Sequence, residues 1–235
     1  MIPASIAALA GAAGIAGAGA FGAMHPASQL FGRTIRHAGN QRALALTFDD
    51  GPNPRITPQL LDLLERHQIQ ATFFVIGKFA RECAALTAEI AARGHLLGNH
   101  TESHPDLIWL GSKRIEAELA RCQEAIHRST GKTAVWMRPP YGFRGPQLDA
   151  AVRRGGFKAV VMWSAWAWDW KPQAAEPVIH RLRRVRGGDI VLLHDGDHRA
   201  LNGDRIHTVA ALEYWLPRWK DAGREFVTID SISPA

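Results

Sequence analysis

Short apolar runs alternate with longer amphipathic segments along most of this chain of 235 residues. In the first run Leu44, Leu46 and Phe48 lie two positions apart, a spacing typical of a strand with one face in a core. Six similar runs predict further strands, at residues 71–76, 95–98, 134–137, 157–162, 189–193 and 225–229. Between the runs apolar residues recur every three or four positions, which predicts helices. Strands that alternate with helices in this way pair in parallel, so the sequence predicts one barrel-like α/β domain.

The charge balance is basic, with a formal net charge of +6 that arginine largely supplies. Nucleic-acid-binding domains commonly interleave basic and aromatic residues, or carry zinc-finger or recognition-helix patterns. The sequence has none of these patterns. Its densest basic stretch, Arg181–Arg186, contains Leu182 and Val185 at helical spacing, which is typical of the solvated face of an amphipathic helix. We therefore expect no nucleic acid as a partner.

The first 24 residues carry no charged side chain and are mostly alanine, glycine and isoleucine. Their length could span a bilayer, and Ala18–Ala20 resembles a signal-peptidase site, although a basic n-region is missing. Small residues could equally pack one helix against another, and the arginines that follow oppose export under the positive-inside rule. We expect a membrane-anchor or signal-like segment at residues 1–28 and a catalytic domain at residues 42–232. We also expect the protein to belong to the cell envelope, either membrane-associated or exported, with its orientation undecided.

Two cysteines are too few for a disulfide framework. Cys83 and Cys122 each fall on an apolar stripe of a predicted helix, where a free cysteine acts as a small hydrophobe. We expect free thiols, with a bridge between neighbouring helices as the alternative.

Reactive side chains follow five of the predicted strands. They are Asp49 and Asp50 after the first strand, His100 and His104 after the third, Arg138 and Tyr141 after the fourth, a tryptophan-rich stretch after the fifth, and His194 after the sixth. Because the carboxyl ends of parallel strands share one rim of a barrel, we expect these groups to converge.

Asp50, His100 and His104 form a set that suits a metal ion. The two histidines lie four apart, so both could reach one ion if the segment turns helically. One carboxylate and two imidazoles leave further coordination positions open, as a catalytic zinc requires. Taken alone, an Asp-Asp-Gly turn is more often merely solvated, but a metal on Asp50 would also explain why a second carboxylate stands beside it.

The remaining polar groups suit acid–base chemistry. Asp49 is left free to act as a base, and Arg138, held between a strand end and two prolines, can keep it ionised. His194 would be the acid that protonates a leaving group.

Five ordered motifs resemble those of the polysaccharide deacetylases (carbohydrate esterase family four, the NodB-homology domain). They are T-F-D-D-G-P-N, G-N-H-T-E-S-H, R-P-P-Y-G, D-W at residues 169–170, and I-V-L-L-H-D-G. The resemblance covers residues 44–229 and implies an irregular (β/α)7 barrel that forms a single catalytic domain.

The resemblance also implies the chemistry. Asp50, His100 and His104 would bind a divalent metal, usually zinc, that acidifies water and polarises the carbonyl. The other implied roles are Asp49 as general base, Arg138 to fix it, the Tyr141 N–H in an oxyanion site, His194 as acid, Asp169 to support His194, and Leu192 in the acetyl pocket. The reaction would be hydrolysis of N-acetyl groups on an amino-sugar polymer or oligomer such as peptidoglycan or chitin, by a protein expected to be a monomer. Two alternatives are an O-deacetylase of acetylated xylan and a non-catalytic glycan-binding barrel.

The sequence departs from the family at Trp166, where many members carry an acid. This puts in question how the charge of Arg138 is balanced. Trp166 belongs to a stretch with Trp163, Trp168 and Trp170. If the stretch is extended, Asp169 faces His194 while Trp166 and Trp170 line the glycan site; the alternative is that these indoles are barrel core.

Overall fold

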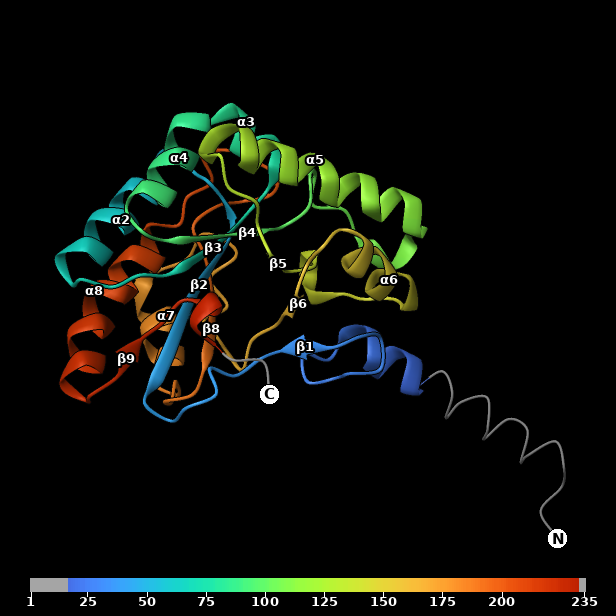
Figure 1. Ribbon diagram of the computed structural model, residues 1–235. Helices are drawn as coiled ribbons and strands as arrows, with labels where there is room; N and C mark the ends of the chain where they lie inside the picture. Colours follow the sequence, from blue (N-terminus) through green and yellow to red (C-terminus); the bar gives the residue numbers. More distant parts are fainter. Residues whose placement is uncertain (1–16, 233–235) are drawn as a thin grey trace, which may run out of the picture.

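The computed structural model describes residues 17–232, and within them a parallel sheet curls into an incomplete barrel (Figure 1). The sheet runs in the order β1-β6-β5-β4-β3-β2-β8-β7, and β9 pairs with one end of β2. The strands are β1 (Thr34–Ile35), β2 (Ala43–Gly51), β3 (Thr72–Val75), β4 (Leu96–Asn99), β5 (Trp136–Met137), β6 (Ala159–Val161), β7 (Ala165–Trp166), β8 (Ile190–His194) and β9 (Glu225–Phe226). The predicted barrel is confirmed.

The long strand β2 lies inside the sheet, between β3 and β8, and every one of its residues is buried. Leu44, Leu46 and Phe48 face the helices and join the main apolar cluster. The alternate residues Ala45 and Thr47 face the barrel interior and are likewise fully covered. A central parallel strand is packed on both faces, so β2 has no solvated face.

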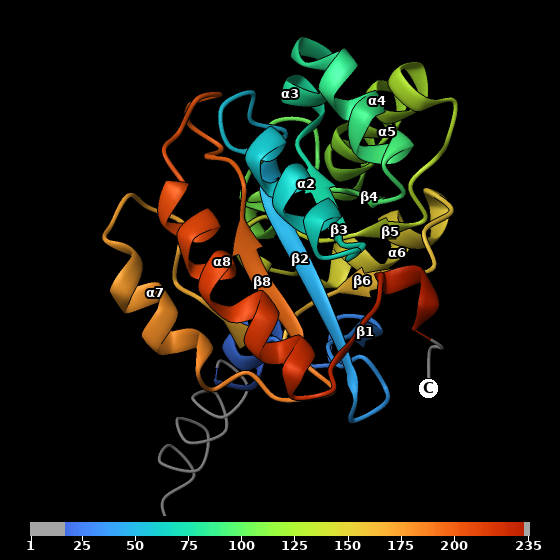
Figure 2. The same cartoon turned by 90° about the vertical axis from the view of Figure 1, so that its left-hand side faces the viewer.

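Helices cover the outside of the sheet, with α2 and α8 next to each other over β2 and β8 (Figure 2). They are α2 (Thr57–Arg66), α3 (Gly77–Glu82), α4 (Ala84–Ala92), α5 (Ser112–Thr130), α6 (Pro146–Arg154), α7 (Ala175–Leu182) and α8 (Ile206–Asp221). Pro217 does not end α8. The proline removes one helical hydrogen bond, but the buried side chains of Leu216 and Trp219 on either side keep the helix packed on the barrel.

Two short strands, β1 and β7, add to the seven that the sequence predicts. Thr34 and Ile35 pair with β6, and Ala165 and Trp166 pair with β8. A strand of two residues has no periodicity of its own, so only pairing with a neighbour defines it.

The two cysteines are free, as expected. Cys122 is buried on α5, and its Sγ donates to the carbonyl of Val75 at 3.3 Å. Cys83 is only half-buried, because the expected single helix breaks at this residue into α3 and α4.

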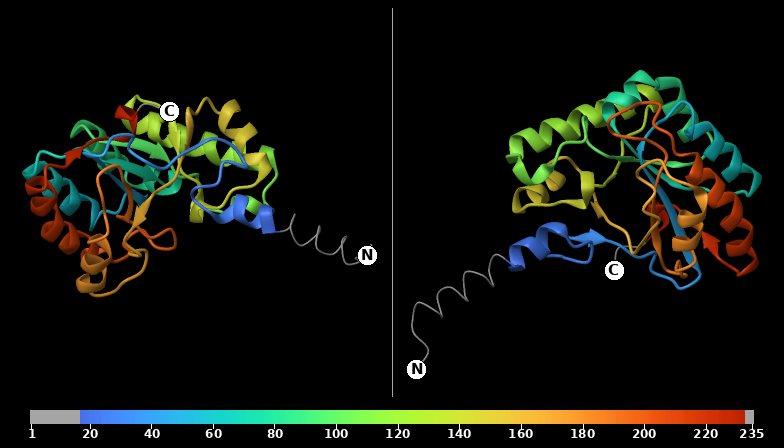
Figure 3. Two further views of the ribbon diagram at one scale, coloured as in Figure 1. Left: turned by 90° about the horizontal axis from the view of Figure 1, so that it is seen from below. Right: turned by 180° about the vertical axis from the view of Figure 1, so that it is seen from behind.

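The barrel includes residues ahead of the expected domain boundary at Arg42. The segment before β1 lies alongside β6 and α6 (Figures 1 and 3). The fully buried guanidinium of Arg144 donates to the carbonyl of His25 at 2.7 Å and to that of Ser28 at 3.1 Å. These carbonyls anchor the segment, because a buried guanidinium needs acceptors.

Within residues 17–232 no helix has the length and apolar character needed to cross a membrane. Residues 1–16 of the expected anchor or signal-like segment at residues 1–28 lie outside the described residues.

Candidate active site

The predicted reactive residues meet at a cleft of about 340 Å³ at the carboxyl ends of the strands. Its lining side chains come from five strand ends and the loops after them: Asp49, Asp50, His100, His104, Tyr141, Gly142, Phe143, Trp163, Trp166, Trp170, Leu192, His194, His198 and Arg199. Arg138 and Asp169 lie behind this lining, each in contact with one of its members. The structure therefore brings every predicted site residue together.

Asp49 is held by Arg138. The Nη1 of Arg138 donates to Asp49 Oδ1 at 2.8 Å and to the hydroxyl of Thr47 at 2.8 Å. Its other nitrogens donate to the carbonyls of Val161 and Met162, and its guanidinium lies 4.3 Å from the centre of the Phe74 ring. The charge of Arg138 is thus balanced by Asp49 and by backbone oxygens. It needs no second acid at position 166, where many family members carry one and this chain has Trp166.

Asp50, His100 and His104 form a compact set of possible metal ligands. Their nearest ligand atoms all lie within 4.8 Å of one another, and all three side chains are buried. Asp50 Oδ1 is 3.5 Å from His100 Nε2 and 3.2 Å from His104 Nε2. These distances suit three groups that face a common centre.

The two histidines reach this centre from an irregular loop and not from the helical turn that their spacing suggested. Thr101 and His104 both adopt left-handed backbone conformations, with φ of 68° and 59°. The loop is fixed by hydrogen bonds: Asn99 Oδ1 accepts from the backbone N–H of Thr101, and the Thr101 hydroxyl accepts from that of His104. Left-handed conformations of residues other than glycine are strained, and such strain concentrates at functional sites.

The hydrogen bonds and charges around this set fit a metal ion. His100 Nδ1 lies 2.7 Å from the carbonyl of Arg138. A carbonyl only accepts, so Nδ1 carries the proton and Nε2 offers its lone pair to the centre. Metal-binding histidines usually donate from their other ring nitrogen to an oxygen in this way. Asp50 Oδ1 is buried without a hydrogen-bond partner among the described residues.

The pKa values of His104 and Asp50 agree with this assignment, while burial of His100 is outweighed by the Asp49 and Asp50 carboxylates, which raise the pKa of His100. Burial lowers the pKa of His104 to about 3, so this imidazole is neutral, as a ligand must be. Burial opposes ionisation of Asp50, but the nearby histidines lower its pKa well below the usual range. The set is therefore one anionic oxygen and imidazole nitrogens, which suits a divalent cation.

His194 is held by Asp169, and it lies beside Asp49 in the β2–β8 pair. Its Nδ1 lies 2.8 Å from Asp169 Oδ1, and its backbone N–H donates to Asp169 Oδ2 at 2.9 Å. Thr208 donates to the same carboxylate. Burial lowers the pKa of His194, but the Asp169 carboxylate outweighs it and raises the pKa to about 9. His194 is therefore protonated at neutral pH.

Trp166, Trp168 and Trp170 are not barrel core, but Trp163 is half-buried and packs against the apolar cluster that contains Met162. Trp166 and Trp170 are each 37% exposed and Trp168 is 46% exposed, whereas Asp169 is fully buried. The rings of Trp166 and Trp170 are stacked, with centres 5.6 Å apart. Asp169 turns inward and Trp166 and Trp170 line the cleft as expected, but the stretch is not extended throughout, because Trp168 adopts a left-handed conformation with φ of 56°.

Two other predicted residues line the cleft. Leu192 is buried beside Trp166, its partner across the β7–β8 pair. Tyr141 adopts a left-handed conformation with φ of 60°, and its ring packs edge-on against His104 at 4.6 Å.

Sequence reasoning missed His198 and Asp195. The ring of His198 stacks on that of His104 at 4.2 Å, and its Nδ1 lies 3.6 Å from Asp50 Oδ2. Burial raises the pKa of Asp195 to about 7, and a Cβ on Gly51 would lie only 2.1 Å from its carboxylate. His198 belongs to no local pattern, because only the loop after β8 brings it to the cleft; Asp195 belongs to the I-V-L-L-H-D-G motif, but the motif gave no sign of its burial.

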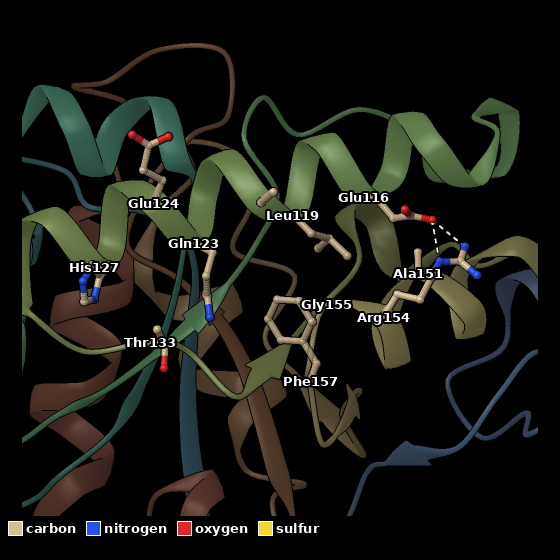
Figure 4. A pocket seen from close by; sticks show the side chains of 11 residues that line it. Glu116, Leu119, Gln123, Glu124, His127, Thr133, Ala151, Arg154, Gly155 and Phe157 are labelled. Atoms are coloured by element: carbon tan, nitrogen blue, oxygen red, sulfur yellow. Dashed lines mark hydrogen bonds and ion pairs between the residues drawn. The ribbon is translucent and has the colours of Figure 1, made fainter.

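A groove between α5 and α6 lies on the outside of the barrel (Figure 4). Glu116 and Arg154 form an ion pair at one end of it, with Nε 2.9 Å from Oε1, and Phe157 lies in its floor. Among residues 17–232, the metal-ligand set described above is the only group of histidine, cysteine and acidic side chains close enough together to hold a metal ion. The catalytic candidate is therefore the cleft at the strand ends.

Comparison with known proteins supports this assignment. The family model described as polysaccharide deacetylase matches residues 36–160. A chitooligosaccharide deacetylase of Azorhizobium caulinodans is 35% identical, over 83% of this chain and 96% of its own length. A peptidoglycan-N-acetylglucosamine deacetylase of Bacillus cereus is 34% identical, over 82% of this chain and 89% of its own length.

The fold has close counterparts among solved structures. A crystal structure of a peptidoglycan N-acetylglucosamine deacetylase superposes with a TM-score of 0.78 at 33% identity, covering 85% of this chain and 91% of that one. The resemblance drawn from the five motifs is confirmed.

Proposed function

Because this chain belongs to the polysaccharide deacetylase family, we propose that it removes N-acetyl groups from a glycan that contains N-acetylglucosamine. It is an amide hydrolase, whose reaction releases acetate and leaves an amine on the sugar. The observation that carries the proposal is the meeting in one cleft of an arginine-held carboxylate, a possible metal-binding triad and a carboxylate-held imidazole.

Asp49 serves as the general base of this reaction. Arg138 holds Asp49 Oδ1 at 2.8 Å and so fixes the carboxylate, while Oδ2 lies toward the metal-ligand set, 3.8 Å from His100 Nε2. A carboxylate in this position takes a proton from water as the water oxygen attacks the acetyl carbonyl.

His194 serves as the general acid. The carbon–nitrogen bond of an amide breaks readily only when the leaving nitrogen is protonated, and a histidine whose pKa is about 9 carries that proton at neutral pH. Asp169 orients the ring so that Nε2 is the donor, because Nδ1 is engaged with the carboxylate.

Asp50, His100 and His104 would hold the metal. A divalent ion there supplies a Lewis acid for the acetyl carbonyl and lowers the pKa of a nearby water. We propose zinc, because two imidazoles and one carboxylate form the ligand set of many catalytic zinc sites.

The substrate we propose is a chitooligosaccharide or a peptidoglycan strand, as the names of the relatives suggest. Acetate release should be measured on chitotetraose, on peptidoglycan fragments and on acetylated xylan, with the Asp49→Asn variant as the inactive control. We expect acetate from at least one of the two amino-sugar substrates. Release from acetylated xylan alone would assign the chain to O-deacetylation and contradict the proposal.

Replacing Asp169 with asparagine should move the alkaline limb of the pH profile to lower pH. The carboxylate stabilises the protonated form of His194, so its loss lowers the His194 pKa from about 9. His194 of the variant then loses its proton at a lower pH than in the wild-type enzyme. We expect the alkaline fall of kcat/KM to lie about one to two pH units lower in the variant. A lower rate with an unchanged alkaline limb would show that Asp169 acts only on folding or ring orientation.

Replacing Trp166 with alanine should raise KM for oligosaccharides. Its indole lines the cleft and is 37% exposed, so it offers a face to the C–H groups of a sugar ring. The loss of such a contact should raise KM about two- to tenfold and leave the melting temperature almost unchanged. Trp168→Ala is the matched control, because Trp168 is 46% exposed and is not part of the cleft lining. An equal rise of KM in both variants would refute a specific role for Trp166.

A further inference from the structure

A second cleft, of about 410 Å³, adjoins the candidate active site. It is lined by Met24, His25, Pro26, Ala27, Arg36, Tyr141, Phe143, Trp163, Ser164 and Trp166. Tyr141, Phe143, Trp163 and Trp166 also line the catalytic cleft. The two clefts therefore share a wall of aromatic side chains.

The segment before β1 forms the far wall of the second cleft. Arg144 fixes this wall, because its guanidinium and backbone N–H donate to the carbonyls of Ala23, His25 and Ser28 at distances of 2.7 to 3.1 Å. Arg144 itself is fully buried. The second cleft is therefore a fixed part of the barrel surface.

Arg36 gives the second cleft a positive charge. The residue follows directly on β1 and is half-buried. Its Nε is buried without a hydrogen-bond partner, and no acidic side chain of residues 17–232 forms an ion pair with it. The cleft lining contains neither aspartate nor glutamate. A guanidinium partly removed from water and without an anion favours an anionic ligand.

We infer that the second cleft binds a sugar residue that carries a carboxylate, next to the N-acetylglucosamine that is deacetylated, with Arg36 as the partner of that carboxylate. This inference rests on the proposed function. The planar guanidinium matches a carboxylate in a bidentate pair. The indoles of Trp163 and Trp166, stacked with centres 5.9 Å apart, offer the sugar ring an apolar face. A hexosamine with an O-lactyl group whose carboxyl is free, as in wall glycan strands stripped of their peptides, has this chemistry, and the uniform neutral sugar of chitin lacks it.

The test compares two substrates that differ in one charge. The first is a wall-derived tetrasaccharide of alternating N-acetylglucosamine and lactyl-hexosamine with free carboxylates, and the second is the same tetrasaccharide with the carboxylates reduced to alcohols. The wild-type enzyme should show about tenfold higher kcat/KM on the first, mainly through a lower KM, since hydrogen bonds between charged groups are among the stronger ones. The preference should shrink as salt is added.

Arg36→Gln should abolish this preference, and Arg36→Lys should retain part of it, because a lysine keeps the charge but not the bidentate geometry. Arg184→Gln is the matched control for net charge, since Arg184 is exposed and lines neither cleft. It should keep the full preference.

The outcomes separate the inference from the proposed function. Equal kcat/KM of the wild-type enzyme on both tetrasaccharides would overturn the inference and leave the proposed deacetylation standing, and this comparison needs no variant to fold. A preference that survives in Arg36→Gln would also overturn it. Absence of acetate from both tetrasaccharides and from chitotetraose would overturn the proposed function, and the inference with it.

Discussion

Replacing Asp49 with asparagine is expected to lower kcat on an N-acetylated oligosaccharide by about 10²- to 10⁴-fold, the usual contribution of a general base. The amide keeps the shape of the carboxylate and can still accept the hydrogen bond from Arg138, but it cannot take a proton from water. Because Asp50, His100 and His104 are unchanged, the metal content should stay at the wild-type value. The measurements are steady-state acetate release and metal analysis on the same preparation.

This substitution also affects stability, so the rate must be expressed per folded molecule. Arg138 is fully buried, and Asp49 is its only anionic partner among the described residues. Loss of one member of a buried pair costs about 3–5 kcal/mol when nothing replaces it, and the asparagine carbonyl should reduce that cost. Asp62→Asn serves as the control, because Asp62 forms an exposed ion pair with Arg93 on the outside of the barrel. Wild-type kcat in a folded Asp49→Asn protein would remove Asp49 from the role of base.

Replacing His104 with alanine is expected to reduce metal occupancy and to lower activity by at least about 100-fold. The Nε2 of His104 lies 3.2 Å from Asp50 Oδ1, and its loss leaves one imidazole and one carboxylate, too few to hold the ion firmly. Metal content can be measured directly, and thermal unfolding gives a second measurement. Added zinc should raise the melting temperature of the wild-type apoprotein, because a ligand that binds only the folded state stabilises it, and this rise should vanish in the variant.

His180→Ala provides the control for the loss of a histidine as such. His180 is exposed on α7 and lies outside the metal-ligand set, so both the metal content and the zinc-induced rise in melting temperature should be preserved. Full activity of the wild-type protein after exhaustive chelation, with metal absent by analysis, would contradict metal dependence altogether.

The barrel and most of the catalytic cleft follow from the order of apolar runs and reactive residues along the chain. Parallel strands that alternate with helices must close with their carboxyl ends on one rim, so Asp49, His100 and His194 had to come together once their strands were recognised. Each of these residues directly follows or ends an apolar run that is long enough to show a period. For such residues the apolar run that predicts the strand also gives their position at the rim of the barrel.

The remaining features depend on contacts between segments that are far apart in the chain. The two-residue strands β1 and β7 exist only through pairing with β6 and β8, and the left-handed backbone of His104 is held by contacts that its spacing from His100 does not reveal. The wall of the second cleft, Arg36 within it and His198 beside the metal-ligand set likewise come from segments that carry no periodic signal. Their positions depend on contacts between residues far apart in the chain, such as Arg144 with His25. A local pattern cannot encode such contacts, because their stability comes from the packing of segments that meet only after the barrel has closed.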